Sequence, residues 1–163
     1  MRKIVEYVPN FSEGRRPPRP MRNVEIRPFR IEDTDAVLEL WRSVGMAGPG
    51  RSPRADIRKK LRHSPESFFV GLQEGRVVAT VMAGYDGHRG WIYSLAVRPG
   101  LQRRGIGRAM VEAAETWLRG QGCRRVKLQV DPDRKEAVGF YRRLGYEVQD
   151  LVSMRKTFKI TDS

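Results

Sequence analysis

A short stretch rich in arginine and glycine, residues 102–107, has the residue types that bind an anion. It lies between an apolar alternating segment, residues 91–97, and an amphipathic segment that begins at Ile106. The first N–H groups of a helix have no partner within the helix, and the macrodipole adds about half a positive charge there. Glycine lets the backbone approach a ligand closely or adopt an unusual φ. We therefore predict a phosphate or pyrophosphate site at this turn, in a field strengthened by Arg103, Arg104 and Arg108.

Two common phosphate-binding loops do not match this turn. A Walker loop requires Gly-Lys followed by Ser or Thr, and the chain contains no such triplet. A dinucleotide-binding loop requires G-x-G-x-x-G at the start of a doubly wound fold, and Met110 stands where its third glycine should be.

The string from Val97 to Gly107 resembles the acetyl-CoA pyrophosphate loop of the GNAT N-acetyltransferase superfamily. The shared features are a strand that ends Val-x-Pro, the pattern Gln-x-x-Gly-x-Gly and an amphipathic helix. The resemblance implies acetyl-CoA as the acyl donor, direct attack of an amine on the thioester, and no need for a metal. It also implies pairing of main-chain groups with the pantetheine amides and the pyrophosphate. The implied residues are Leu95, Ala96, Val97, Gln102, Arg103, Arg104, Gly105, Ile106, Gly107 and Arg108.

The segment at residues 91–97 is predicted to be a central strand covered on both faces, because both of its faces are largely apolar. Its alternation places Trp91, Tyr93, Leu95 and Val97 on one face and Ile92, Ser94 and Ala96 on the other. Pro99 and Gly100 end the strand.

Apolar periodicity and turn residues predict the other elements. Strands are expected at residues 24–28, 68–72, 77–82, 125–130 and as a closing pair within 146–158, and helices at 33–44, 54–62, 106–119 and 136–143. From Val24 to Phe158 this order resembles the GNAT fold. The resemblance implies an α/β fold with a mixed, mostly antiparallel sheet of six to seven strands and about four flanking helices, in which a splayed strand pair holds acyl-CoA. Residues 80–90 resemble a narrower group, the bacterial YpeA-type acetyltransferases, which implies no defined acceptor.

Residues 1–21 are expected to be a flexible basic extension ahead of an acetyltransferase domain at residues 22–163. Residues 15–20 consist of arginines and prolines only, in the order RRPPRP. The string VEYVPNFSEGRR resembles the opening of glutamate formiminotransferase domains. That resemblance ends near residue 16 and is too short to imply their fold or folate chemistry.

Tyr141 is the candidate general acid. The segment FYRRLGY at residues 140–146 resembles a corner of the family whose first tyrosine often points at the cofactor sulfur. The alternative role for Tyr141 is a core aromatic on a short helix. Two positions differ from related enzymes: Arg134 replaces an asparagine found in many members, and Gln129 replaces the glutamate base of ribosomal-protein α-amine acetylases.

Asp86 and His88 are the candidate bases, because the attacking amine must be neutral. A lysine-like amine with a pKa of about 10.4 costs about 4.6 kcal/mol to deprotonate at pH 7, and an α-amine costs about 1 kcal/mol. An exposed histidine titrates near neutrality. The alternative is turn chemistry, in which Asp and Gly serve the backbone geometry.

Composition limits the function classes. A length of 163 residues fits one domain, no apolar run approaches 18 residues, and no signal-peptide pattern occurs, so we expect a cytoplasmic protein. The single cysteine, Cys123, fits a reducing compartment. The net charge of +13 is dispersed and lacks any zinc-finger or helix-turn-helix pattern, which disfavours nucleic acid as the main partner.

We expect a small-molecule or peptide amine as the acceptor, no membrane partner, and a monomer or homodimer. Three alternatives stay open: an acetylase of ribosomal or other protein N-termini, a non-catalytic acyl-CoA-binding regulator, and a nucleic-acid-binding module.

Overall fold

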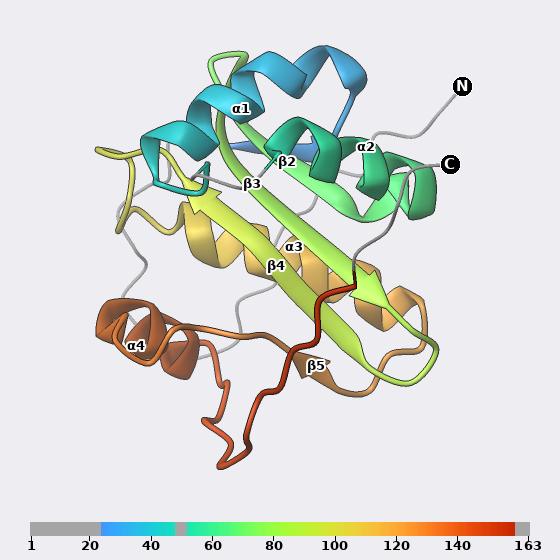
Figure 1. Ribbon diagram of the computed structural model, residues 1–163. Helices are drawn as coiled ribbons and strands as arrows, with labels where there is room; N and C mark the ends of the chain where they lie inside the picture. The colour runs from blue at the N-terminus through green and yellow to red at the C-terminus, as the bar shows by residue number, and fades with distance from the viewer. Residues whose placement is uncertain (1–23, 48–51, 159–163) are drawn as a thin grey trace. The chain divides into compact units, whose positions relative to one another are not determined.

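The computed structural model describes residues 24–47 and 52–158 (Figure 1). The predicted extension at residues 1–21 and its boundary lie outside this range. The chain divides into two compact units, one that ends at Lys127 and one that begins at Leu128, and each is described by itself. None of the helices in the described ranges is long and apolar enough to cross a membrane.

The first unit contains a five-stranded sheet in the order β1-β2-β3-β4-β5. The strands are β1 (Glu25–Pro28), β2 (Phe68–Gln73), β3 (Arg76–Tyr85), β4 (Gly90–Val97) and β5 (Val126–Lys127). The first four are antiparallel neighbours, and β5 pairs parallel with β4. The turn between β2 and β3 contains Glu74 at φ 52° and Gly75 at φ 73°, as expected for a tight hairpin turn. The sheet is therefore mixed and mostly antiparallel, as predicted.

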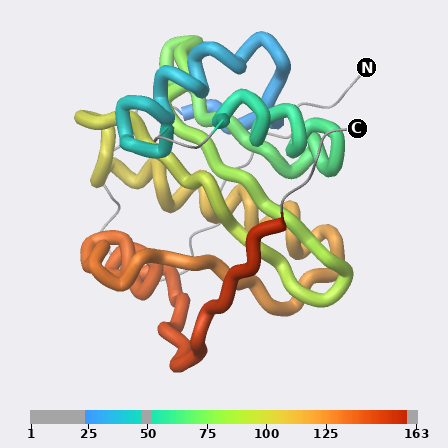
Figure 2. Tube along the Cα trace, viewed as in Figure 1, coloured from blue at the N-terminus to red at the C-terminus, as the bar shows by residue number. Residues whose placement is uncertain are grey.

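Helices cover both faces of this sheet (Figures 1 and 2). On one face lie α1 (Thr34–Ser43) and α2 (Pro53–His63), and on the other lies α3 (Ile106–Gly120). In β2, Val70 belongs to the cluster packed under α1, whereas a side chain at Gly71 would meet the Met110 sulfur of α3. The α3 positions that face the sheet recur at helical spacing. They are Ile106, Met110, Val111, Ala114 and Leu118, all buried.

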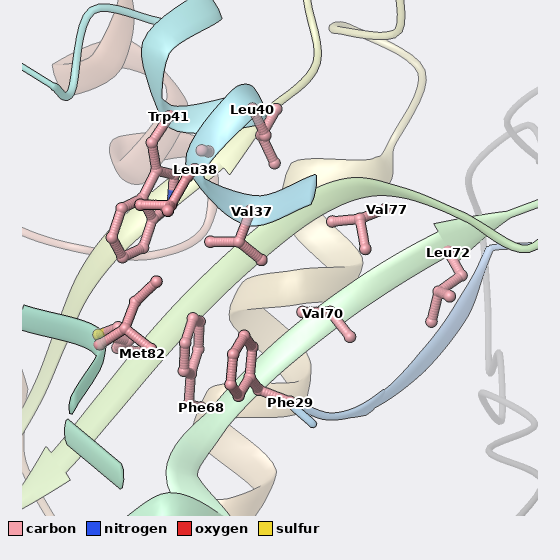
Figure 3. Packing of buried hydrophobic residues seen from close by; sticks show 12 residues of the cluster. Phe29, Val37, Leu38, Leu40, Trp41, Phe68, Val70, Leu72, Val77 and Met82 are labelled. Carbon is pink, nitrogen blue, oxygen red and sulfur yellow. The ribbon is translucent and has the colours of Figure 1, made fainter. Parts of the chain in front are cut away.

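The core beneath α1 is built on stacked aromatic rings (Figure 3). Phe29 and Phe68 stack with centroids 4.4 Å apart, and Trp41 lies 6.2 Å from Phe68. Val37 and Leu40, which are separated from Trp41 by four residues and one residue along α1, are fully buried. This packing fixes α1 against β3 and β4.

The strand β4 departs from the predicted alternation. Tyr93 lies opposite Met82, and Ala96 lies opposite Thr80, so Tyr93 and Ala96 point to the same face although they are three residues apart. The cause is a β-bulge that contains Ser94 at φ 53°. A bulge adds one residue to one strand and shifts the phase of the side chains that follow it.

The second unit contains α4 (Lys135–Arg143), which confirms the predicted helix there. The predicted closing strand pair is absent from the described residues 146–158, and β5 covers two residues instead of six. The sheet of the described residues therefore has five strands, and the expectation of six to seven is not met. The alternating apolar side chains of this segment have no opposing apolar surface, since Val148 is 66% and Met154 90% exposed. Strands of this kind need such a surface to be stable.

Candidate functional site

The loop between β4 and α3 turns through three left-handed residues. Gly100 has φ 82°, Arg103 φ 59° and Gly105 φ 86°. Gly105 occupies the position before the first helical residue. Its φ of 86° confirms that this glycine adopts an unusual φ. Gly107 lies in the first turn of α3 and is not among the residues with positive φ. Consecutive turns of this kind direct main-chain N–H groups toward one side, where they bind anions.

The loop is tied to the end of β4 by Gln102. Its Nε2 donates to the carbonyl oxygen of Val97 at 3.1 Å. The main-chain N–H of Leu101 donates to the Arg98 carbonyl at 3.0 Å, and that of Arg98 donates to the Val78 carbonyl at 2.8 Å. The glutamine of the sequence motif thus braces the loop in this structure.

The start of α3 is electropositive. Its first turn contains no acidic residue, and Arg104 and Arg108 are exposed beside it. Arg108 forms an exposed i,i+4 ion pair with Glu112 at 3.8 Å, which neutralises little charge in water. Ile106 is buried and holds the helix start against the core, and the first helical bond runs from Ala109 N–H to the Gly105 carbonyl at 3.1 Å. The N–H groups of Ile106, Gly107 and Arg108 precede this bond and have no partner within the helix, which leaves them able to face an anion.

The edge of β4 that faces β5 is paired over a short stretch. The parallel register joins Gly90 with Val126 and Trp91 with Lys127. Within the described residues, the part of β4 beyond Trp91 has no strand partner on that side. The residues predicted to pair with pantetheine, Leu95–Val97, lie on this stretch directly after the bulge.

The bulge is anchored by a buried chain of hydrogen bonds from α1. The Trp41 Nε1–H donates to Thr80 Oγ1 at 2.9 Å, and the Thr80 hydroxyl donates to the Ser94 carbonyl at 3.1 Å. Thr80 is fully buried, so neither bond competes with water. Local sequence patterns give Trp41 no such role. The signal available was a threonine inside an otherwise apolar strand.

A buried lysine lies under the same part of β4. Lys60 of α2 is 6% exposed and contacts the Tyr93 hydroxyl at 3.1 Å. Burial lowers the pKa of Lys60 to about 8, and the Glu66 carboxylate raises it in part. Lys60 lies among other basic residues within the helix predicted at residues 54–62, and a lysine in such a segment gives no signal of burial.

Comparison with known proteins identifies the family. Residues 34–146 match the Acetyltransferase (GNAT) family. Acetyltransferase ECA0875 from Pectobacterium atrosepticum is 40% identical over 133 residues, which are 82% of this chain and 94% of that relative. The chain belongs to the GNAT acetyltransferase family. It is an N-acetyltransferase by this membership.

Solved structures share the GNAT fold. Ard1 from Thermoplasma volcanium is 28% identical with a TM-score of 0.67, over 77% of this chain and 84% of that chain. Aminoglycoside N-acetyltransferase AAC(6')-Iy, solved in complex with CoA, is 17% identical with a TM-score of 0.70, over 83% and 95%. The second likeness shows the fold alone.

Asp86 and His88 lie at the hairpin between β3 and β4, at the opposite end of β4 from the glycine-bearing loop (Figure 1). This separation is roughly 20 Å of strand at about 3.3 Å per residue. Asp86 Oδ1 accepts the N–H groups of Arg89 at 2.5 Å and His88 at 2.8 Å, which lower the pKa of this carboxyl. The structure therefore does not bring the candidate general bases Asp86 and His88 close to the glycine-bearing loop. The Asp86 carboxylate instead accepts the main-chain hydrogen bonds that shape the turn.

Tyr141 lies on α4 in the second unit, between two other aromatic rings. Its centroid is 5.0 Å from that of Phe140 and 5.5 Å from that of Tyr146, both edge to face. Burial raises the pKa of Tyr141 to about 12, and the charge of Arg134 opposes this. The hydroxyl is therefore protonated at neutral pH.

The described ranges hold no candidate metal site. They contain no group of three or more His, Cys, Asp or Glu side chains that could hold an ion.

Proposed function

We propose that this enzyme moves an acetyl group from acetyl-CoA to a primary amine by direct attack of the amine on the thioester. The loop between β4 and α3 is the observation that carries the proposal. Its left-handed turns, the free N–H groups at the start of α3 and the exposed arginines suit a diphosphate. The proposed contacts come from the main chain of residues 103–108, with Gln102 holding the loop in place.

The open edge of β4 supports the second part of the donor site. A chain with amide groups can add to such an edge as a further strand does. Pantetheine carries amides, so we assign its binding to the main chain of Leu95, Ala96 and Val97. The strand pairing ends at Trp91, so within the described residues this stretch has no strand partner on that side.

The bulge supports a place for the reacting carbonyl. A bulge leaves a residue out of the ladder, and the register gives Ser94 and Leu95 no partner residue on β3, so we assign an N–H group of this pair to the ligand. A preorganised donor there would stabilise the negative charge that develops on the thioester oxygen. The Thr80 hydroxyl holds the Ser94 carbonyl and thereby fixes the direction of this part of the main chain.

Tyr141 is the proposed donor of a proton to the leaving thiolate. A pKa of about 12 lies about 3.5 units above that of a thiol near 8.5, whereas an ordinary tyrosine lies about 1.5 units above it. Positioning of the Tyr141 hydroxyl must therefore contribute more to proton transfer than it would for a tyrosine with an ordinary pKa.

The proposed acceptor is a primary amine on a small molecule or a peptide. The aminoglycoside acetyltransferase meta-AAC0020 from an uncultured soil metagenomic sample is 25% identical, with a TM-score of 0.65 over 83% of this chain and 97% of that chain. Small molecules with several amines are therefore the first class to test. We also place the chain in the YpeA-type group on residues 80–90, where Asp86 and Gly87 shape the turn.

Calorimetric titration with CoA and a thiol-release assay across amines, aminoglycosides and peptides test this function. We expect micromolar or tighter CoA binding and thiol release that depends on one class of amine. CoA binding without thiol release from any amine would instead support a non-catalytic acyl-CoA-binding regulator. Absence of CoA binding, together with salt-sensitive binding to DNA or RNA, would overturn the assignment in favour of a nucleic-acid-binding module.

A further inference from the structure

The ammonium of Lys60 has one more neighbour than it has protons. Its Nζ donates to Ser64 Oγ at 2.8 Å, to Ser67 Oγ at 2.6 Å and to the Ala83 carbonyl. These three acceptors use all three N–H groups. The fourth neighbour is the Tyr93 hydroxyl, at 3.1 Å. When Lys60 is neutral, its lone pair can accept the Tyr93 proton, so the arrangement suits both protonation states.

Burial favours the neutral form of Lys60 near pH 8. Burial lowers its pKa to about 8, and Glu66 of the 3-10 helix η2 (Pro65–Ser67) opposes this. The strand β3 contributes the uncharged carbonyl of Ala83, and β4 contributes Tyr93. Burial also raises the pKa of Tyr93, so the phenol stays neutral in this range. A base is most effective when its pKa is close to the working pH.

Tyr93 joins this buried amine to the candidate reaction site. It is 42% exposed, whereas Lys60 is 6% exposed. It precedes Leu95 by two residues, about 7 Å along a strand, and the bulge at Ser94 lies between them. The phenol therefore reaches from an accessible surface beside the bulge to an amine that substrate cannot touch.

We propose that Tyr93 accepts the proton of the acceptor amine and relays it to Lys60, which acts as the base of the reaction. The proposal rests on the proposed acetyl transfer and adds the path of the proton. Tyr93 is the catalytic residue in this path, and Lys60 acts through it.

The relay balances in protons and electrons. The acceptor ammonium gives one proton to Tyr93 Oη while the Tyr93 proton moves to the lone pair of neutral Lys60. The acceptor becomes a neutral amine, Lys60 becomes an ammonium, and Tyr93 stays neutral. The amine nitrogen bonds to the thioester carbon, the C–S bond breaks, and Tyr141 gives its proton to the leaving thiolate. The second amine proton restores the Tyr141 hydroxyl through solvent. Lys60 then returns its proton through Tyr93 to solvent.

The test is the pH profile of kcat/KM between pH 6 and 10, with Tyr93→Phe, Lys60→Met and the control Lys59→Met. Lys59 is an exposed lysine on the same helix. We expect wild type and Lys59→Met to show a rising limb with an apparent pKa of about 8. We expect Tyr93→Phe to lose about 100-fold in kcat and to lose that limb, as for removal of an acid–base group. The profile is measured with two acceptor amines of different pKa. A limb caused by the enzyme keeps its apparent pKa with both acceptors, whereas a limb caused by the acceptor shifts with the pKa of the amine.

CoA affinity separates the two proposals. The relay would be overturned if Tyr93→Phe binds CoA as wild type does and keeps the wild-type kcat and the rising limb of the pH profile. Acetyl transfer as the proposed function would still stand. Wild type that neither binds CoA nor releases thiol would overturn the proposed function and the relay with it. Should Lys60→Met fail to fold, Tyr93→Phe decides alone, because it removes one oxygen and keeps the ring.

Discussion

The Trp41 indole N–H donates to the Thr80 hydroxyl at 2.9 Å, and that hydroxyl donates in turn to the carbonyl of Ser94. One buried side chain thus connects α1 to the irregular point of β4. The position of the bulge depends on a contact between elements that are far apart in sequence.

Thr80→Val should destabilise the protein and slow it. The change keeps the shape but leaves the Trp41 N–H buried without a partner, which costs about 2 kcal/mol. We expect kcat to fall about tenfold with CoA affinity little changed, because the loop after β4 is intact. Chemical denaturation and steady-state kinetics measure both effects. Thr80→Ser, which keeps the hydroxyl, should stay within about threefold of wild-type kcat; an equal loss in both variants would contradict the role of the hydrogen bond.

Gly105→Asp should abolish CoA binding. It adds a side chain at φ 86° and a negative charge where the diphosphate is proposed to lie. The matched control is Gly122→Asp at φ 79° beyond the other end of α3, where an added Cβ meets no atom within 4 Å. Calorimetry should show at least a 100-fold loss of affinity for the first variant and near wild-type affinity for the second. Similar losses in both would point to folding instead of binding.

Tyr141→Phe should lower kcat about 100-fold without changing CoA affinity, if its hydroxyl protonates the thiolate. Tyr146→Phe removes a hydroxyl from the neighbouring ring, 5.5 Å away by centroids, and serves as the control. Thiol release at saturating acetyl-CoA measures the effect. Unchanged turnover of Tyr141→Phe would leave Tyr141 as an aromatic that packs α4.

Stability should rise with pH in a window set by Lys60. Its pKa is about 8 in the folded chain and 10.5 in the ordinary state, so between these values the unfolded chain binds more protons. The free energy of unfolding therefore increases from pH 8 toward pH 10 and decreases as pH falls to 8, by about 1 to 3 kcal/mol after solvent screening. Urea unfolding should show this increment in wild type and Lys59→Met. It should be missing in Lys60→Met, and its presence there would exclude Lys60 as the source.

Local patterns predicted most of what positions the site. The apolar stripe from Ile106, the hairpin at Glu74 and Gly75, and the left-handed Gly105 all follow from spacing and turn chemistry within a few residues. The glycine-bearing loop that resembles the GNAT family could be predicted for the same reason, because its residues are contiguous in the sequence.

Features that depend on contacts between residues far apart in the sequence could not be predicted from local patterns. Period-two alternation in residues 91–97 predicted a regular strand, and no local signal marks the bulge that places Tyr93 and Ala96 on one face. The burial of Lys60 depends on Ser67 and Ala83, which come from other elements. Alternating apolar residues after Tyr146 predicted strands, but alternation says nothing about whether an opposing surface exists.

The burial of Lys60 has a consequence for the enzyme itself. An amine whose pKa lies near 8 is largely unprotonated in mildly basic solution and is the kind of nucleophile that a thioester acylates. Ser64, Ser67 and Ala83 surround its nitrogen, and Tyr93 stands on the accessible side. The same enclosure that makes Lys60 reactive thus guards it from self-acetylation by the proposed acetyl-CoA donor.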